Sequence, residues 1–321
     1  MLYLRRTSRC LPPQRLLLLC FVVLVSLIIG YQLGKLQHQL EPHVLRESKK
    51  TESFLVVLVF SAPENLNKRE VIRQTWLNTY RGKEVLHLFV IGKAMISPDV
   101  WKQLEVENSK YQDLLLLEDV KDSYFSLTSK LLSALAWLSE NIYFSYVFKA
   151  DDDTFAQLDI MLDELKRASA SLYWGFFDGR ARVKQSGKWA ERDWVLCDLY
   201  LPHALGGGYV LSSDLVSFVA KNKEFLTLYK SEDVSLGTWL APVNVHRKHD
   251  PRFDTEHISR GCFNSYIVTH KQSVEQMKEK YNSLKQNGKL CALEVRSRYS
   301  YIYNWGVPPS KCCVRNETKI P

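Results

Sequence analysis

Several features that would point to common classes of function are missing from the sequence. It contains no internal repeat and no low-complexity tract, and its composition, with 46% hydrophobic and 24% charged residues, is typical of a globular chain of one large or two small domains. No compact stripe of Lys and Arg interleaved with aromatics is present, which argues against nucleic-acid binding. The seven cysteines form no CxxC pair and no Cys/His spacing typical of a zinc site.

Acidic residues are missing from positions 1–15, and charge of either sign is missing from positions 16–33. About 18 apolar residues is near the minimum that crosses a bilayer as a helix. A cleaved signal peptide is the alternative, but it would need a shorter apolar core and a small-x-small cleavage site. The pattern therefore predicts a cytoplasmic tail over 1–15 and a single retained transmembrane helix over 16–34, in type II orientation. Half of the net charge of +8 comes from Arg5, Arg6, Arg9 and Arg15.

The residues after this span are predicted to lie in the lumen of the secretory pathway. Residues 35–53 are polar and aperiodic, which indicates a stem, and residues 54–321 would form the lumenal domain. A short span favours the thinner membranes of the early secretory pathway. Asn316 lies in the one Asn-x-Thr sequon and is a candidate glycosylation site. Two disulfides with one free thiol, or an intermolecular bridge, are open for the five lumenal cysteines: Cys197, Cys262, Cys291, Cys312 and Cys313.

Apolar runs and helical periodicities alternate after the stem. Residues 54–60, FLVVLVF, form a continuous apolar run that is typical of a strand covered on both faces. This alternation predicts an α/β fold with a parallel-rich sheet and helices on both sides. Ligands of such sheets bind outside the carboxyl ends of the strands. Further strands are expected over 85–91, 114–117 and 146–149, and helices over 65–78, 97–111, 126–141 and 157–167.

Three consecutive aspartates, Asp151–Asp153, follow the strand expected at 146–149. Neighbouring carboxylates repel by about 4 kcal/mol at 4 Å and an effective dielectric near 20. A helix cap with two solvated neighbours is one explanation, although a cap needs a single aspartate. Phe155 and Ala156 exclude an EF-hand loop, which would need Asp or Asn and then Gly there, and Phe155 also excludes a phospho-aspartate phosphatase. The remaining hypothesis is an Asp-x-Asp site for Mn²⁺ or Mg²⁺ bound partly through substrate phosphates.

Five further motifs surround the KADDD stretch at 149–153 in a fixed order. With them the chain resembles the β-1,3-glycosyltransferase family, glycosyltransferase family 31, from about residue 54 to the C-terminus. The resemblance implies a single-pass Golgi membrane enzyme of GT-A type, which is a Rossmann-like mixed sheet flanked by helices. The motifs are REVIRQTW at 69–76, YQDLL at 111–115, DSY with LTSK at 122–130, GGGYVLS at 206–212 and EDV at 232–234.

Four other stretches resemble the members of this family that extend the linkage region of proteoglycans. That likeness implies UDP-galactose as the donor, Mn²⁺ as the cofactor with Mg²⁺ possible, and Galβ1-4Xyl on a core-protein serine as the acceptor. The alternatives are a β-1,3-N-acetylglucosaminyl- or N-acetylgalactosaminyltransferase on another glycan, and a lumenal glycan-binding or chaperone protein without turnover. The stretches are YWGFF at 173–177, LGTWLAP at 236–242, HDPRFDTE at 249–256 and PPSKCC at 308–313.

The resemblance also implies roles for individual residues. Asp153 and His270 are implied as metal ligands, while Asp151 and Asp152 would bond ribose hydroxyls and metal-bound water. Asp233 is implied as the base that removes the proton of the acceptor hydroxyl in an inverting transfer, with Glu232 as the fallback. Further donor contacts are implied at Arg69, Arg73, Tyr124, Lys130 and Gly207.

Each of these roles has a plain structural alternative. The arginines would form a solvated basic face, Tyr124 and Lys130 ordinary helix surface, and the glycines a turn. His270 would be a structural histidine, and Asp233 an acid at a helix N-terminus. Residues 234–237, VSLG, depart from the commoner VYVG of the family, so the acceptor contacts of the wider family are not carried over.

Overall fold

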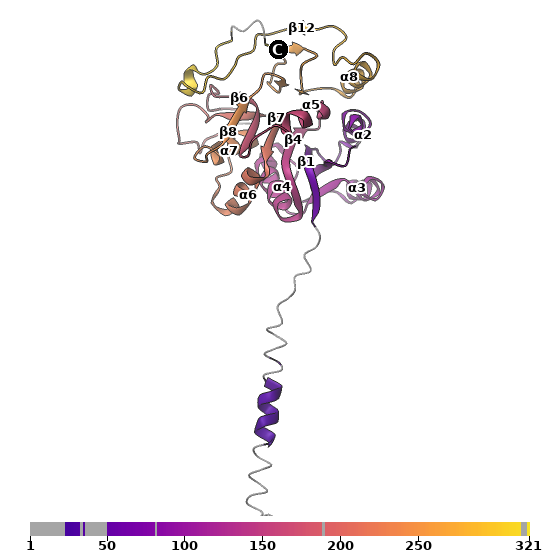
Figure 1. Cartoon of the computed structure of the whole chain (residues 1–321), viewed down its shortest axis with the longest axis vertical. Coiled ribbons are helices and arrows are strands. Elements are labelled where there is room, and N and C mark those ends of the chain that lie inside the picture. The colour runs from indigo at the N-terminus through magenta and orange to yellow at the C-terminus, as the bar shows by residue number, and fades with distance from the viewer. Residues whose placement is uncertain (1–22, 33–34, 36–49, 81, 188–189, 316–319) are drawn as a thin grey trace, which may run out of the picture. The chain divides into compact units, whose positions relative to one another are not determined.

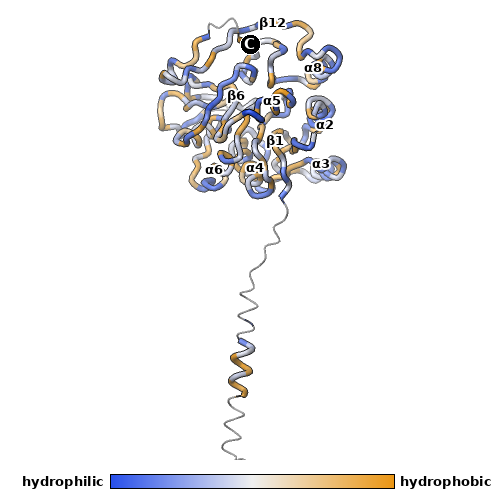
Figure 2. Tube along the Cα trace, viewed as in Figure 1, coloured by the Kyte–Doolittle hydropathy of each residue, from blue (hydrophilic) through white to orange (hydrophobic). Residues whose placement is uncertain are grey.

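The computed structural model describes residues 23–32, 35, 50–80, 82–187, 190–315 and 320–321. It divides into two units, Met1–Lys50 and Thr51–Pro321. In the first unit residues 23–32 are helical, and Figure 2 shows this segment as largely hydrophobic. Among the residues described, no helix is both long enough and apolar enough to cross a membrane. The predicted tail, both ends of the predicted span, most of the predicted stem, and Asn316 lie outside the described residues, so these features stay predictions.

A seven-stranded mixed sheet forms the centre of the second unit (Figure 1), in the order β3-β2-β1-β4-β7-β6-β8. The first four of these strands pair in parallel, β7 runs antiparallel to both β4 and β6, and β8 is parallel to β6. The predicted α/β class with a mixed sheet is therefore confirmed. The strands are β1 (Thr51–Phe60), β2 (Val85–Gly92), β3 (Leu114–Leu117), β4 (Ile142–Asp151), β6 (Leu172–Asp178), β7 (His203–Ser212) and β8 (His246–His249).

The core follows the apolar runs of the sequence. Leu55 to Val59 of β1 are fully buried, as expected for a central strand with helices on both faces. In α4 the leucines at helical spacing, Leu131, Leu135 and Leu138, are buried on one side of the helix. The helices are α2 (Leu66–Gln74), α3 (Pro98–Tyr111), α4 (Leu127–Asn141), α5 (Leu158–Leu165), α6 (Ser213–Lys221), α7 (Glu232–Trp239) and α8 (Val274–Asn287).

Two short sheets complete the second unit. One joins β5 (Phe155–Ala156), β11 (Val268–Thr269) and β9 (Phe253–Asp254), and the other pairs β10 (Gly261–Cys262) with β12 (Val295–Arg296). Disulfides join Cys262 to Cys291 and Cys312 to Cys313, and Cys197 is a free, exposed thiol. Of the arrangements left open by the sequence, the structure has two disulfides and one free cysteine.

Strand register brings three segments together at one edge of the main sheet. Phe60 at the end of β1 pairs with Asp151 at the end of β4, and Ala150 pairs with Gly208 of the antiparallel β7. The glycine triplet of β7 therefore lies beside the carboxyl end of β4. This is the edge at which ligands of α/β sheets bind.

Candidate active site

A cavity of about 1060 Å³ opens at this edge of the sheet. That volume is at the upper end of the range of small-molecule sites, about 300–1,000 Å³. Its lining combines the carboxyl end of β4, the glycines of β7 and the start of α7. Nine residues singled out from the sequence line it: Tyr124, Lys130, Asp151, Asp152, Asp153, Gly207, Glu232, Asp233 and His270.

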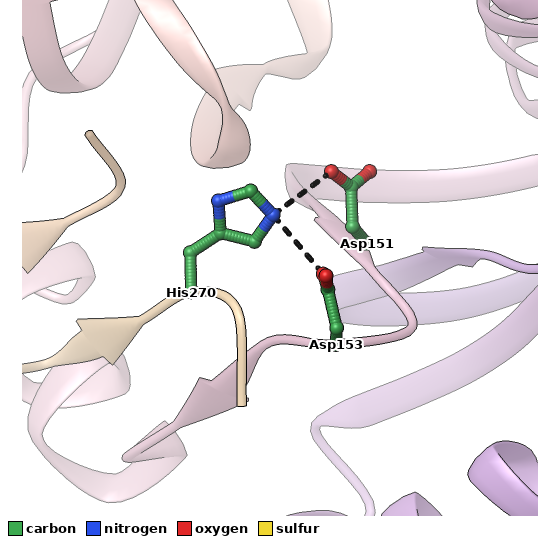
Figure 3. Close-up of side chains that lie close together, drawn as sticks. All are labelled: Asp151, Asp153 and His270. Atoms are coloured by element: carbon green, nitrogen blue, oxygen red, sulfur yellow. Dashed lines mark ion pairs between the residues drawn. The ribbon is translucent and has the colours of Figure 1, made fainter. Parts of the chain in front are cut away.

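Asp151, Asp153 and His270 point toward one another (Figure 3). Nε2 of His270 lies 3.4 Å from Oδ2 of Asp151 and 3.0 Å from Oδ1 of Asp153. One ligand atom from each of the three residues lies within 4.8 Å of the others. The sequence assigned Asp151 to the donor rather than to the metal, so the structure enlarges the predicted pair of ligands to a cluster of three.

Local hydrogen bonds fix the backbone of this cluster. The turn after β4 closes with the Thr154 amide donating to the carbonyl of Asp151 at 3.2 Å. Pairing of Thr269 with Phe155 carries β11 alongside this turn, so that His270 emerges next to Asp153. On the far side of His270 the Gln272 amide donates to the carbonyl of Asp153 at 2.7 Å. The backbone therefore holds all three side chains before any ligand arrives.

The charged groups of the cluster shift one another's pKa values. Desolvation alone would raise the pKa of Asp151, but Lys149 and His270 outweigh it and hold that pKa well below its usual value. Burial would lower the pKa of His270, but hydrogen bonding to and the charges of Asp151 and Asp153 raise it to about 9. Asp151 therefore remains ionised at neutral pH, and the cluster favours positive charge between its carboxyl groups.

These three residues fit a divalent cation. Carboxylate oxygens suit Mg²⁺ and Mn²⁺, and an imidazole nitrogen extends the range toward transition metals. Nε2 of His270 faces the two carboxylates, while its Nδ1 is buried and has no hydrogen-bond partner among the described residues. A set of only three protein ligands leaves positions for substrate oxygens. Asp151, Asp153 and His270 are the residues that would hold the ion.

Gly207 is required by the position of His270. A Cβ atom built on Gly207 would lie only 2.4 Å from Nδ1 and 2.5 Å from Cγ of the imidazole. Contacts this short force one group to move. The glycine therefore lets the backbone of β7 pass close to the imidazole.

We expect Gly207→Ala to displace the His270 ring and to weaken Mn²⁺ binding by about 10–100-fold, the range seen when groups that orient a metal ligand are changed. Titration of the purified variant with Mn²⁺, followed by electron paramagnetic resonance, measures this. Gly187→Ala is not a suitable control because Gly187 has a positive φ of 80°. Gly306→Ala is suitable, since its added methyl would meet only a side-chain oxygen of Asn304 at 3.3 Å. Unchanged Mn²⁺ affinity in Gly207→Ala would contradict the assigned geometry.

The carboxylate of Asp152 is bonded to residues outside the cluster. Its Oδ2 accepts hydrogen bonds from Ser61 and Asn65, each at 2.8 Å, and its Oδ1 is 2.8 Å from Nζ of Lys68. These partners belong to the loop after β1 and to the start of α2. Asp152 therefore fixes that loop along the cavity wall, and its contact with ribose hydroxyls stays a prediction.

Arg69 and Arg73 do not line the cavity, which corrects the predicted contacts with the donor. The guanidinium of Arg69 is fully buried and bonded to Glu107 of α3 and to the carbonyls of Ala62 and Pro63. Arg73 is bonded to Glu107 and Asp113. The helical spacing placed both arginines on one face, but that face packs against α3 rather than ligand.

Lys130 and Tyr124 do reach the cavity. Lys130 is buried, with Nζ 2.8 Å from the carbonyl of Ser61 and paired with Asp122. Burial lowers the pKa of Lys130 despite the opposing charge of Asp122. Tyr124 is more than half exposed at the cavity wall. Lys130 therefore braces the loop after β1, and Tyr124 is the more accessible of the two to a ligand.

Asp233 occupies the first turn of α7 and faces the cavity. Its Oδ2 accepts a hydrogen bond from the Gly206 amide at 3.0 Å, and its Oδ1 accepts one from the Val234 amide at 2.8 Å. The neighbouring Glu232 is buried against Lys149, with Oε1 2.5 Å from Nζ. Burial raises the pKa of Glu232 to about 7, with Lys149 opposing and Asp233 and Asp151 adding to the shift. Of the two acids, Asp233 is the accessible one.

Comparison with known proteins agrees with this site. The galactosyltransferase family model matches residues 67–251, which span α2 to the end of β8 and include the aspartates and Asp233. The chain is 51% identical over 275 residues to beta-1,3-galactosyltransferase 6 of Mus musculus, covering 84% of this chain and 85% of that protein. The chain belongs to the galactosyltransferase family. It is therefore a glycosyltransferase, as the motifs in the sequence predicted.

More distant relatives share part of this galactosyltransferase domain. UDP-GalNAc:beta-1,3-N-acetylgalactosaminyltransferase 2 of Danio rerio is 32% identical over 191 residues, with 59% of this chain and 38% of that protein covered. Hydroxyproline O-galactosyltransferase GALT6 of Arabidopsis thaliana is 29% identical over 252 residues, with 74% and 36% covered. The chain thus spans little more than a third of the length of these two relatives.

Two solved structures share a weak likeness with this chain. The 4-diphosphocytidyl-2C-methyl-D-erythritol synthase from Anaerococcus prevotii DSM 20548 is 15% identical, with a TM-score of 0.41 over 73% of this chain and 97% of that chain. The WbbM bifunctional glycosyltransferase is 14% identical, with a TM-score of 0.38 over 62% and 39%. TM-scores below 0.5 carry no argument about the fold, which is established here by its own strand order.

Proposed function

We propose that this galactosyltransferase is an inverting, metal-dependent enzyme of GT-A type. It transfers galactose from UDP-galactose in β1-3 linkage to Galβ1-4Xyl attached to a serine of proteoglycan core proteins, a step in glycosaminoglycan synthesis. One observation carries the reaction class: the Asp151–Asp153–His270 cluster and Asp233 line the same cavity. The 51% identity to beta-1,3-galactosyltransferase 6, over most of both chains, supports galactose as the transferred sugar.

The residues of the cavity account for the steps of such a transfer. The acceptor oxygen forms a bond to the anomeric carbon while the bond from that carbon to the diphosphate oxygen breaks, and UDP departs. Asp233 takes the proton of the acceptor hydroxyl, since a single base is sufficient for inversion. When bound, Mn²⁺ or Mg²⁺ would offset the negative charge of the departing diphosphate. Asp151, Asp153 and His270 would hold the ion that offsets this charge, so no second carboxyl group is needed as an acid.

A second candidate function is transfer of N-acetylgalactosamine. The likeness to UDP-GalNAc:beta-1,3-N-acetylgalactosaminyltransferase 2 favours it, although that likeness covers only 59% of this chain. Both functions use the same cluster and the same base. They differ in whether the cavity accepts an acetamido group at the second carbon of the donor sugar.

The proposed location is the Golgi membrane, with residues 16–34 as a type II anchor and the catalytic domain in the lumen. The uncharged stretch after an arginine-rich start supports this orientation. The two disulfides of the described domain suit an oxidising compartment.

Competition between donors tests the function directly. The purified full-length protein is given a Galβ1-4Xyl acceptor with UDP-galactose, UDP-N-acetylgalactosamine or UDP-N-acetylglucosamine, with Mn²⁺ or with a chelator. We expect kcat/KM to be at least about 10²-fold higher for UDP-galactose, equivalent to roughly 2.7 kcal/mol, and transfer to stop with the chelator. Faster transfer from UDP-N-acetylgalactosamine would replace the proposed function with the second candidate, and faster transfer from UDP-N-acetylglucosamine would contradict both. Transfer that is unaffected by the chelator would show that the reaction needs no metal ion.

A further inference from the structure

Lys149 lies at the floor of the cavity, almost fully buried between the metal-ligand cluster and the base. Its Nζ is 2.7 Å from Oδ1 of Asp151, 2.5 Å from Oε1 of Glu232 and 2.6 Å from the carbonyl oxygen of Gly206. These three acceptors belong to three different elements, namely β4, α7 and β7. One side chain therefore connects the metal-binding strand to the helix that carries the base.

The Gly206 peptide extends this connection to Asp233. Its carbonyl accepts from Lys149, and its own amide donates to Oδ2 of Asp233 at 3.0 Å. Asp233 is thus tied to Lys149 by two routes, through the Gly206 peptide and through the neighbouring Glu232 on α7. A displacement of Lys149 would therefore shift the Gly206 peptide and Glu232, and with them Asp233.

The chemistry of the ammonium group shows why this position is fixed. A lysine ammonium has three hydrogen-bond donors. Two of them donate to Asp151 and to the carbonyl of Gly206, and the charge also pairs with Glu232 at 2.5 Å. The rings of Phe60 and Tyr209 lie near Nζ, with centroids at 5.0 and 5.7 Å. The ammonium group lies between the carboxyl groups of Asp151 and Glu232. Without that charge, several carboxylates would face one another across the cavity floor.

Resting on the proposed function, we propose that Lys149 is a positioning residue, which sets the separation between the metal ligand Asp151 and the base Asp233. Its close polar contacts are with groups of the protein, and it acts through them. Its contribution is to keep the group that binds the diphosphate and the group that accepts the proton at a fixed distance, so that both act on one anomeric carbon. Loss of Lys149 should therefore affect metal binding and turnover separately.

The test compares Lys149→Met with Lys248→Met in the full-length protein. Lys248 is also paired, with Glu164 at 3.0 Å, but it does not line the cavity. For Lys149→Met we expect Mn²⁺ affinity, measured by electron paramagnetic resonance, to fall about 10–100-fold. At saturating Mn²⁺, donor and acceptor we also expect kcat to stay about 10²-fold below wild type, because Asp233 is misplaced as well. Lys248→Met should match wild type in both measurements.

Two results would overturn the proposal. If saturating Mn²⁺ restored the kcat of Lys149→Met, the lysine would act on Asp151 alone. If neither the Mn²⁺ affinity nor the kcat of Lys149→Met changed, the lysine would have no positioning role. Failure of wild-type protein to transfer galactose would instead refute the proposed function. The Mn²⁺ titration would still test whether Lys149 positions Asp151. A crystal structure of the variant would test whether Lys149 positions Asp233, which we expect to find displaced.

A second variant covers the case in which Lys149→Met does not fold. Glu232→Gln keeps the shape of the side chain and leaves Lys149 bonded to Asp151 and Gly206. We expect its kcat to fall on the order of 10-fold, a partial misplacement, while its Mn²⁺ affinity stays at the wild-type value. An unchanged kcat, or Mn²⁺ affinity that falls with it, would contradict the separate connections of Lys149 to the base and to the metal ligand.

Discussion

Replacement of Asp153 by alanine is expected to reduce Mn²⁺-dependent galactose transfer by about 10³-fold or more. The variant removes one of three clustered ligands and the carboxylate that lies 3.0 Å from Nε2 of His270. Stabilisation of a leaving group by a metal is worth several kcal/mol, and each 1.4 kcal/mol is about tenfold in rate. The measurement is the initial rate of transfer from UDP-galactose across a Mn²⁺ titration.

Asp163→Ala is the matched control for this variant. Asp163 is an exposed acid on α5, and it does not line the cavity. We expect it to follow the wild-type titration curve. A wild-type rate and Mn²⁺ dependence for Asp153→Ala would show that the cluster is not the metal site.

Replacement of Asp233 by asparagine is expected to lower kcat by about 10²–10⁴-fold, the range that general-base catalysis contributes. Asparagine has nearly the same shape, and its amide oxygen can still accept from the Gly206 amide, which donates to Asp233 at 3.0 Å. The metal ligands are unchanged, so the affinity for UDP with Mn²⁺ should stay within a few-fold of wild type. Single-turnover transfer and titration calorimetry measure the two quantities independently.

Asp159→Asn controls for loss of an acid in the first turn of a helix, because Asp159 has that position in α5 and is exposed. It should leave transfer unchanged. If Asp233→Asn retained wild-type transfer while Glu232→Gln lost it completely, Glu232 would replace Asp233 as the base. Its pKa, raised to about 7 mainly by burial, would be compatible with proton transfer near neutral pH.

The sequence predicted the first half of the sheet well because its signals are local. The apolar run at 54–60 and the leucines of α4 depend only on which residues face the core. The strand expected at 146–149 is longer in the structure, from Ile142 to Asp151, because residues 142–144 pair with the polar start of β1, Thr51 to Ser53. The helix expected at 65–78 ends at Gln74, and a short 3₁₀ turn continues from Trp76 to Thr79.

The sequence pointed to those residues of the candidate site that belong to recognisable motifs. It missed the contacts between residues that are distant in sequence. Alternate residues of an extended chain point to opposite faces, so Asp151 and Asp153 could have been grouped and Asp152 separated from them. The ion pair of Arg69 with Glu107 could not have been foreseen, because it depends on the packing of α2 against α3. The same holds for Lys149, whose partners Gly206 and Glu232 come from β7 and α7.

Anomalous diffraction at the manganese edge, from a crystal grown with Mn²⁺ and UDP, tests the central claim most directly. The account predicts one anomalous peak coordinated by Asp151, Asp153 and His270 and by the diphosphate oxygens of the nucleotide. Nucleotide bound in the cavity with no peak at these three side chains would contradict it.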